Sequence, residues 1–181
     1  MDPSADRRES VIMSEEEAIS IVLEWYEYAL AADVGRLRNL ASVRRGSSHR
    51  VKTRDTSGIG WTEHIEGAAA ELAVAKYLGI YWGGDVDTFK KADVGSDLQI
   101  RWTPSHSNRL IIREADSDDD VYILVTGLVP KLSIRGWITG ADAKKCEFAS
   151  DPESLGKAFF IPIHELQPMK TLAIFADRMA Q

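Results

Sequence analysis

The sequence predicts a single α/β (α+β) domain in which helices flank a mixed β-sheet. Apolar residues recur at helical spacing before residue 80, and apolar and polar residues alternate in short runs after residue 96. The 181 residues suit one domain with a sizeable core. No apolar run approaches the roughly 18 residues of a membrane-spanning helix, and the polar start of the chain does not resemble a secretory signal. A cytoplasmic protein is therefore expected.

The first elements are predicted to be helical. A disordered lead-in is expected over residues 1–12, ahead of one domain spanning 13–181. Ser14 and Glu17 have the spacing of a capping box, and apolar residues follow at helical intervals. We expect a helix from Ser14 to about Ala32, followed by a shorter one over Val34–Ala41.

A cluster of positive charge follows, in a chain whose formal net charge is −6. Residues 36–54 include seven Arg or Lys and no Asp or Glu. Serines and Gly46 disfavour a helix there, so a mobile basic loop is expected to complete a helical and basic-loop region, 13–60. A basic stripe suits contacts to DNA phosphates; a plain solvated loop or a docking site for an acidic partner is the alternative. The side chains expected to contact DNA are Arg44, Arg45, Arg50, Lys52 and Arg54.

A second helix is predicted over Thr62–Leu78. Thr62 can cap it, Glu63 and Glu66 suit its positive N-terminal end, and Gly79 can end it. Its many alanines indicate close packing against a sheet. The expected buried stripe is Ile65, Ala68, Ala69, Leu72 and Ala75.

The remainder of the chain is predicted to be mostly strands. Residues 97–102 alternate, which places Asp97, Gln99 and Arg101 on one face of a strand. The acidic segment Asp116–Asp120 is expected to be a hairpin tip. Pro168 is expected to start a closing helix that includes Leu172, Phe175, Ala176 and Met179. The other predicted strands are Leu110–Arg113, Val121–Thr126, Leu132–Thr139 and Ala158–Ile161.

Four side chains in this order suggest chemistry: Glu71, Asp93, Gln99 and Arg101. Magnesium prefers oxygen ligands and usually takes one or two carboxylates from a protein. Glu71 and Asp93 can supply the carboxylates, and the Gln99 amide can add a neutral oxygen. Arg101 can hold a phosphate or stabilise the charge that develops on it. A metal-bound water would be the nucleophile.

These residues resemble the motifs of the PD-(D/E)XK nuclease superfamily, particularly its small phage and bacterial members. Gly67-Ala68-Ala69-Ala70-Glu71 is similar to the family's N-terminal helix, whose glutamate is a common accessory ligand. Asp93 matches the metal-binding aspartate, and Gln99-Ile100-Arg101 falls where the family has Asp/Glu-x-Lys. The resemblance implies a restriction-endonuclease-like fold, a Mg²⁺ or Mn²⁺ cofactor, DNA as substrate and a bacterial or phage-infected cell. It also suggests a homodimer, because many relatives are dimers.

The sequence departs from the family pattern at two positions. Gln99 removes one negative charge from the metal site, although glutamine occurs there in some family members. Arg101 replaces the lysine, and it keeps the charge but cannot act as a general base. Asp97 is on the same predicted face and can replace the lost carboxylate as a metal ligand.

Simpler interpretations remain open for each site residue. Glu71 can be a solvated residue of a helix surface, and Asp93 can be a turn residue that bonds its own backbone. Gln99 and Arg101 can form the solvent face of an edge strand. Cys146 is the only cysteine and the four histidines are scattered, which argues against a structural zinc site.

Two functions follow from these observations. The first is a Mg²⁺- or Mn²⁺-dependent DNA nuclease that hydrolyses phosphodiester bonds. The second is a catalytically weak or inactive module of the same fold that binds DNA or a protein partner. A weaker third hypothesis is an accessory protein of a phage or mobile element that inhibits a host factor.

Overall fold

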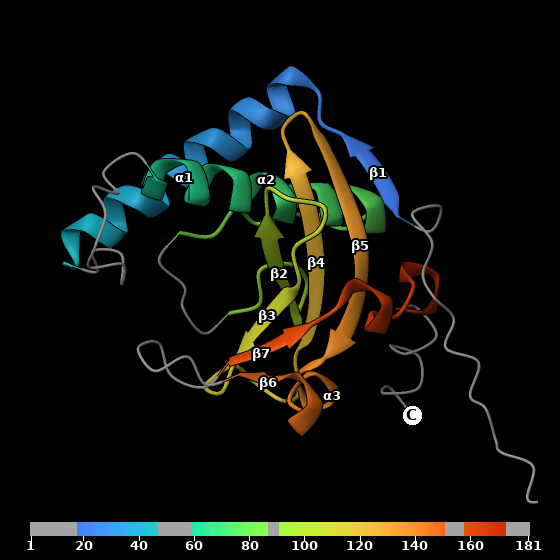
Figure 1. Ribbon diagram of the computed structural model, residues 1–181. Helices are drawn as coiled ribbons and strands as arrows, with labels where there is room; N and C mark the ends of the chain where they lie inside the picture. The colour runs from blue at the N-terminus through green and yellow to red at the C-terminus, as the bar shows by residue number, and fades with distance from the viewer. Residues whose placement is uncertain (1–17, 47–58, 87–90, 151–157, 173–181) are drawn as a thin grey trace, which may run out of the picture.

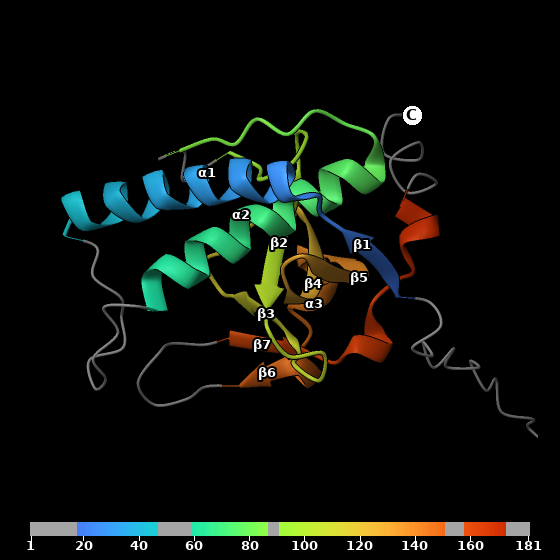
Figure 2. The ribbon, with the colours of Figure 1, turned by 90° about the horizontal axis from the view of Figure 1, so that it is seen from above.

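Three layers make up the part of the protein that the computed structural model describes, which is residues 18–46, 59–86, 91–150 and 158–172. Two long helices cover one face of a four-stranded sheet, and a smaller three-stranded sheet packs on the other face (Figures 1 and 2). The predicted α+β class, a mixed sheet with helices, is confirmed. The helices are α1 (Trp25–Arg44), α2 (Ile59–Leu78) and α3 (Gly140–Ala143). The strands are β1 (Ile19–Val22), β2 (Leu98–Thr103), β3 (Leu110–Arg113), β4 (Val121–Leu128), β5 (Lys131–Thr139), β6 (Ala149–Ser150) and β7 (Ala158–Ile161).

The N-terminal helix begins later than its sequence pattern predicts. Ile19–Val22 is a strand that pairs antiparallel with β5. A helix that begins at Trp25 follows, and the Glu27 carboxylate accepts a hydrogen bond from the Glu24 backbone N–H at 2.7 Å. The helical spacing was misleading because Ile19 and Ile21 alternate with exposed residues, which is the two-residue period of a strand. Ser14 and Glu17 lie outside the described residues.

The first part of the expected basic loop is helical. Arg36, Arg38 and Arg44 belong to α1, which continues to Arg44 and ends before Gly46, where φ is 68°. Packing along α2 stabilises the helix through the serine-containing segment that disfavours it locally. Arg50, Lys52 and Arg54 lie outside the described residues.

Helix α2 lies between α1 and the four-stranded sheet (Figure 2). It starts at Ile59, three residues before the predicted Thr62, and ends at Leu78 as predicted. The predicted Ala68, Ala69 and Ala75 are fully buried, whereas Ile65 and Leu72 are only half-buried. The small alanine side chains allow the helix to approach neighbours on two sides.

The two long helices approach each other most closely at Gly35. A Cβ added there would lie 2.5 Å from the Cα of Ile65 and 2.7 Å from the carbonyl oxygen of His64. A side chain at position 35 would therefore collide with the backbone of α2. This contact sets the distance between the two helices. It thereby allows Arg38, the next inward-facing residue of α1, to bond Glu71 of α2.

The larger sheet has the strand order β1-β5-β4-β2, so β2 is an edge strand. Strand β2 pairs parallel with β4, and the other pairs in this sheet are antiparallel. Each strand predicted after residue 96 is present, with β4 and β5 extended by one or two residues. The pairing places Gln99 beside Tyr122 and Arg101 beside Leu124.

The acidic segment before β4 is not a hairpin tip, because β3 and β4 belong to different sheets. Strand β3 pairs with β7, and β7 with β6, to form the three-stranded sheet. Residues 114–120 therefore cross from one sheet to the other. The sequence could not reveal this, since alternation identifies a strand but not its neighbour.

Separate apolar cores cover the two faces of the larger sheet. Ile100 and Ile123 pack with α2 on one face, and Tyr122 and Leu124 pack with the smaller sheet on the other. Gln99 and Arg101 share the face of Tyr122 and Leu124, but at the sheet edge, where cover is incomplete. Polar side chains can therefore be half-buried there without being sealed from solvent.

The last described segment has only part of the predicted closing helix. A 3-10 turn at Met169–Thr171 follows Pro168, and the Trp137 indole donates to the Pro168 carbonyl at 3.2 Å and to Thr171 Oγ1 at 3.1 Å. Phe175, Ala176 and Met179 lie outside the described residues. Within the described ranges, none of the helices is long and apolar enough to cross a membrane.

Glu66, expected as a charge near the helix start, is a buried acceptor. It is 6% exposed, and its carboxylate accepts a hydrogen bond from the Val129 backbone N–H at 3.2 Å. Burial raises its pKa, and the Val129 hydrogen bond opposes this only in part. The side chain thus fixes the turn between β4 and β5 to α2.

We expect Glu66→Gln to stabilise the protein at neutral and higher pH. A carboxyl with a raised folded-state pKa contributes stability below its unfolded pKa and loses it as the pH rises through the folded value. The amide keeps an acceptor for Val129 and never ionises. Thermal unfolding between pH 4.5 and 8 should show a gain in melting temperature that grows with pH. The exposed Glu147→Gln variant should show none; a pH-independent gain for Glu66→Gln would contradict this assignment.

We expect Gly35→Ala to lower the free energy of unfolding by roughly 2–3 kcal/mol, because the new methyl group meets backbone and not a yielding side chain. Urea unfolding measures this change. Gly67→Ala is the matched control, since a Cβ at this α2 position meets nothing within 4 Å. That substitution should stabilise the helix by about 0.5–1 kcal/mol. Equal effects of the two substitutions would contradict the close helix contact.

Candidate functional site

Asp93 occupies the turn that precedes β2 and faces the open edge of that strand. Its Oδ2 accepts a hydrogen bond from the Ile100 backbone N–H at 2.8 Å, and its own N–H donates to the Leu98 carbonyl at 3.0 Å. Burial is the main reason that its pKa is raised, and the charge of Asp120 acts in the same direction. Arg101 and Arg38 act in the opposite direction. The Asp93 carboxylate therefore accepts a hydrogen bond from the backbone of β2, seven residues along the chain, and not from the backbone of its own turn.

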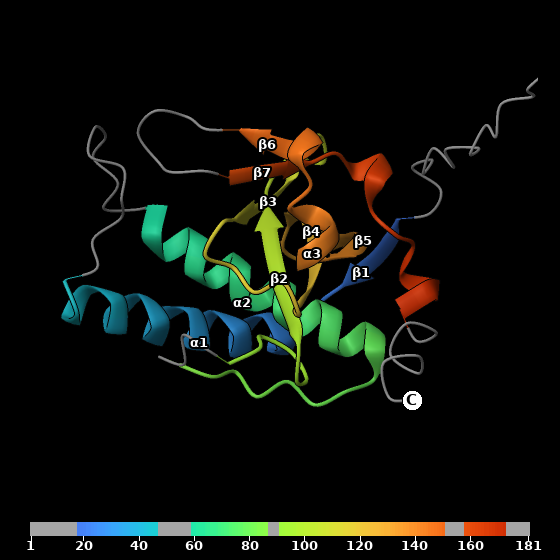
Figure 3. The ribbon, with the colours of Figure 1, turned by 90° about the horizontal axis from the view of Figure 1, so that it is seen from below.

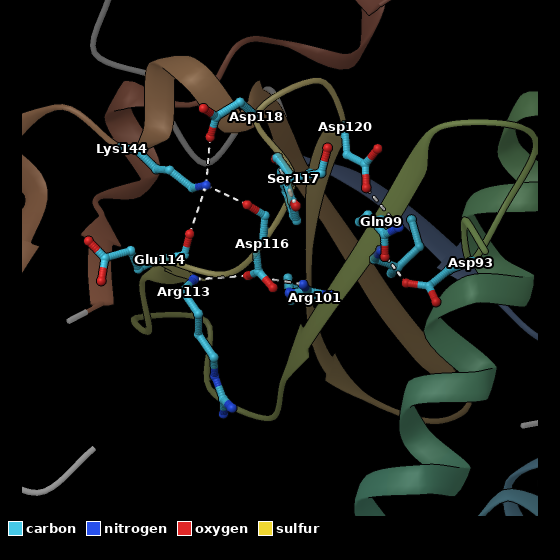
Figure 4. A network of polar contacts seen from close by, with 12 residues as sticks. Asp93, Gln99, Arg101, Arg113, Glu114, Asp116, Ser117, Asp118, Asp120 and Lys144 are labelled. Atoms are coloured by element: carbon cyan, nitrogen blue, oxygen red, sulfur yellow. Dashed lines mark hydrogen bonds and ion pairs between the residues drawn. The ribbon is translucent and has the colours of Figure 1, made fainter. Parts of the chain in front are cut away.

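Gln99 and Arg101 are fixed by acidic partners and are not a plain solvent face. The Gln99 amide Nε2 donates to Asp120 Oδ2 at 3.0 Å. The Arg101 guanidinium bonds Asp116 Oδ2 at 3.2 Å (Figure 4). It also lies over the Tyr122 ring, 5.1 Å from the ring centroid. Both side chains are thus held beside Asp93 by the segment that crosses between the sheets.

That crossing segment is fixed by Lys144, at the end of α3. The ammonium group bonds the carbonyls of Glu114, at 3.1 Å, and Asp116, and pairs with Asp118 Oδ1 at 2.6 Å (Figure 4). The Gly140 N–H donates to the Asp120 carbonyl at 2.9 Å. Asp116 and Asp120 therefore have defined positions even though they belong to a loop.

Sequence reasoning missed Asp120 as a member of the site. It directly precedes β4, and the parallel register pairs Leu98 with Val121, so Asp120 comes to lie beside Gln99. Only knowledge that β2 and β4 are parallel neighbours would have identified it. The acidic composition of the segment carried no information about that pairing.

These side chains line a pocket of about 530 Å³ at the edge of the larger sheet. Its acids come from the loop after α2, the turn before β2 and the crossing segment. Strand β2 contributes Gln99 and Arg101, and further cations come from α1 and the loop after α2. Glu71 and Asp97 are not among the lining residues. The pocket is lined by Arg38, Arg45, His64, Asp85, Lys91, Asp93, Gln99, Arg101, Ala115, Asp116, Ser117, Asp120 and Tyr122.

Glu71 lies behind the pocket wall, bound to Arg38. The Arg38 guanidinium meets both carboxylate oxygens, at 2.5 and 2.8 Å, and the Trp82 indole donates to Oε2 at 3.1 Å. Burial raises the pKa of Glu71, Arg38 and Trp82 lower it, and the charge of Asp93 raises it further. Glu71 is thus an electrostatic neighbour of Asp93. Glu71 is not available as a direct metal ligand, because both of its carboxylate oxygens already accept hydrogen bonds from Arg38.

Asp97 does not replace the missing carboxylate. The strand begins at Leu98, so the alternation that placed Asp97 on the face of Gln99 does not extend to it. Its side chain is exposed and accepts a hydrogen bond from Ser96 Oγ at 3.1 Å. The pocket carboxylate that lies beside Gln99 belongs to Asp120.

The donor set fits a divalent cation that prefers oxygen. Among the described residues, no three His, Cys, Asp or Glu side chains form a group that could hold a metal. Mg²⁺ needs only one or two carboxylates because it keeps several waters. Asp93 and Asp120 each use Oδ2 within the protein, and Oδ1 of each accepts no hydrogen bond in the described part of the chain. With the Gln99 amide oxygen, they offer three oxygen donors and suit Mg²⁺ or Mn²⁺.

The described members of the predicted DNA-contacting set, Arg44 and Arg45, lie at the end of α1 near the pocket. Arg45 follows the last turn of α1 and lines the pocket, and Arg44 is exposed one residue earlier. Arg38 reaches the pocket from the inner face of α1, where its Nε donates to the Asp85 carbonyl at 2.8 Å. Lys91 adds a further cation and pairs with Asp85 Oδ2 at 2.5 Å.

Tyr122 can donate a proton in a hydrogen bond but cannot act as a base near neutral pH. Burial raises its pKa to about 12, helped by the charges of Asp116 and Asp120. Its hydroxyl donates to the Ser117 carbonyl at 3.1 Å. The ring therefore supports Arg101 while its hydroxyl holds the crossing segment.

We expect Arg38→Met to destabilise the protein by about 3 kcal/mol, because it leaves the buried Glu71 carboxylate without its cation. The double variant Arg38→Met/Glu71→Met should recover most of this loss, since replacing both buried partners is often neutral. Urea unfolding of the wild type, both single variants and the double variant provides the measurement. Additive losses in the double variant would contradict the coupling.

Comparison with protein-family models, curated proteins and solved structures gave no match for this chain. The pocket and its chemistry are therefore the basis on which a function is inferred.

Proposed function

We propose that the protein is a metal-dependent nuclease that hydrolyses phosphodiester bonds of DNA and has a restriction-endonuclease-like fold. One observation supports this above all: Asp93 and Asp120 each have a carboxylate oxygen that bonds no described residue, in a pocket that also holds Gln99 and Arg101. Two carboxylates, an amide oxygen and a guanidinium are groups that bind a divalent cation and a phosphate together.

Mg²⁺ or Mn²⁺ held by Asp93, Asp120 and Gln99 would lower the pKa of a bound water and so supply the nucleophile. Arg101 has the role of holding the phosphate. Its guanidinium fork has five N–H donors, and the hydrogen bond to Asp116 uses one of them, so donors remain for a phosphate oxygen. The contact with Tyr122 limits the orientation of the guanidinium.

The cations of the pocket fit a nucleic-acid backbone better than a neutral substrate. Arg45 and Lys91 line the same pocket as Asp93, and Arg44 adds charge at the adjoining end of α1. Contacts of this kind position a phosphate chain without reading its sequence. DNA binding is therefore expected to weaken as salt increases and to depend little on base sequence.

A second function is favoured by the state of Glu71. Because Arg38 satisfies both of its oxygens, one acidic position of the resembled nuclease motif contributes no free ligand. Gln99 removes a second negative charge. A module that binds DNA or a protein partner with little or no hydrolysis is the alternative, and the same experiment separates the two.

We expect the wild type to cleave DNA with Mg²⁺ or Mn²⁺, and Asp93→Asn to lose at least about 100-fold of that activity, at the upper end of the effect of perturbing a metal site. The amide keeps an acceptor for Ile100 N–H, so the strand edge is preserved. Asp97→Asn is the matched control, since it removes an exposed acid four residues away. Linear, supercoiled, branched and single-stranded DNA should each be tested, with gel analysis of the products.

The outcomes distinguish the two functions. Cleavage that survives in Asp93→Asn, or is lost equally in Asp97→Asn, would contradict the proposed site. Salt-sensitive DNA binding by the wild type without cleavage under either metal would support the binding module. Gain of cleavage in Gln99→Glu would then show that weak metal binding, and not misplaced residues, limits activity.

A further inference from the structure

The outer face of α1 is apolar although nothing in the described part of the chain covers it. The inner face packs on α2, where Ala31, Gly35 and Asn39 are buried. The opposite face exposes large side chains to an unusual degree for a soluble helix. Its exposed apolar residues are Trp25 (80%), Tyr26 (57%), Leu30 (55%), Leu37 (44%), Leu40 (46%) and Val43 (68%).

Tyr26, Leu30, Leu37 and Leu40 form one stripe along the helix, and Trp25 and Val43 lie at its border. Residues 26, 30, 33, 37 and 40 follow alternating steps of four and three, which is the spacing of a helix–helix seam. Asp33 and Arg36 are the charged residues at its centre, and Arg44 is at its basic end. Figures 1 and 3 show α1 on the outside of the helical layer, with α2 on its inner side.

We propose that this face binds α1 of a second copy of the chain in antiparallel orientation, about a two-fold axis near residues 34 and 35. The stripe is complementary to itself in that arrangement. Asp33 of each copy meets Arg36 of the other, and Tyr26 meets Val43. Leu30 packs between Leu37 and Leu40.

Charge distribution selects the antiparallel arrangement. The exposed face has Asp33 before its midpoint, and Arg36 and Arg44 after it; Asp33 and Arg36 also pair within the helix at 3.5 Å. Antiparallel helices place each acidic half beside a basic half, and Arg44 beside the Trp25 ring, where a cation–π contact forms. Parallel helices would align Asp33 with Asp33 and Arg36 with Arg36, and like charges would then oppose association.

A two-fold contact also closes on itself. The same patch is used by both partners, so association stops at the dimer and does not extend to a filament. The helix is about 30 Å long at 1.5 Å per residue, so the seam is of moderate length. We expect a dimer that dissociates at low concentration. The inference does not depend on nuclease activity.

Sedimentation equilibrium of the full chain between about 1 and 200 µM tests the proposal. We expect concentration-dependent dimerisation, and at least about tenfold weaker association for Leu37→Glu, which corresponds to about 1.4 kcal/mol. Ile111→Glu is the matched control, because Ile111 is exposed to a similar extent, 45%, but belongs to β3. It should dimerise like the wild type. Thermal unfolding of each variant checks that the monomer is intact.

A charge exchange tests the orientation. Asp33→Arg should weaken the dimer, because it places a second guanidinium beside Arg36 of the partner. Asp33→Arg combined with Arg36→Asp should restore the dimer, since opposite charges then face each other again across the axis, with their positions exchanged. A spin label at Tyr26 adds a distance: about 25 Å between labels for antiparallel helices at 1.5 Å per residue, and far less for parallel ones.

Three results would overturn the proposal. The first is a monomer throughout the concentration range. This includes the case in which surface labelling shows that another segment of the same chain covers the α1 face. The second is a dimer that Ile111→Glu disrupts and Leu37→Glu does not. The third is a short distance between the labels at Tyr26.

Discussion

The ion pair between Arg38 and Glu71 is the interaction on which the rest of the site depends. It joins α1 to α2 through two parallel hydrogen bonds, and the Trp82 indole and the Asp85 carbonyl satisfy further polar atoms of the pair. A half-satisfied buried pair would be strongly destabilising, whereas this one is well bonded on both sides. Its formation requires the close helix approach at Gly35. One consequence is chemical: both carboxylate oxygens of Glu71 are bonded, so the carboxylates that line the pocket belong to other residues, among them Asp93 and Asp120.

The pocket is assembled from two otherwise separate parts of the fold. Arg38 and Arg45 come from the helical layer, whereas Asp116 and Asp120 come from the segment between the two sheets. Strand β2 lies where these parts meet, at the edge of the larger sheet. Its polar face can therefore contact the crossing segment while its apolar face packs under α2. Lys144 and Gly140 fix the crossing segment from its far side.

The sequence predicted the strands after residue 96 well, because alternation is local information. It also placed Asp93, Gln99 and Arg101 together, since few residues separate them. The sequence did not predict contacts that depend on which strands or helices are neighbours in the fold. Asp120 reaches Gln99 only because β2 and β4 are parallel, and Glu71 turns away from the pocket only because Arg38 reaches it from another helix. The β1 strand was mistaken for helix because four residues fit both periods.

The bond from Ile100 to Asp93 has a consequence for how this protein would evolve. An open strand edge invites pairing with other chains, and a polar side chain that occupies the edge amide discourages it. Selection against aggregation would therefore preserve an acceptor at position 93 whatever the pocket does. Position 120 is less constrained by protection of the strand edge, because the Asp120 side chain bonds the Gln99 side chain and not a backbone amide. Position 120 is therefore expected to vary more freely among relatives than position 93, where a hydrogen-bond acceptor protects the strand edge.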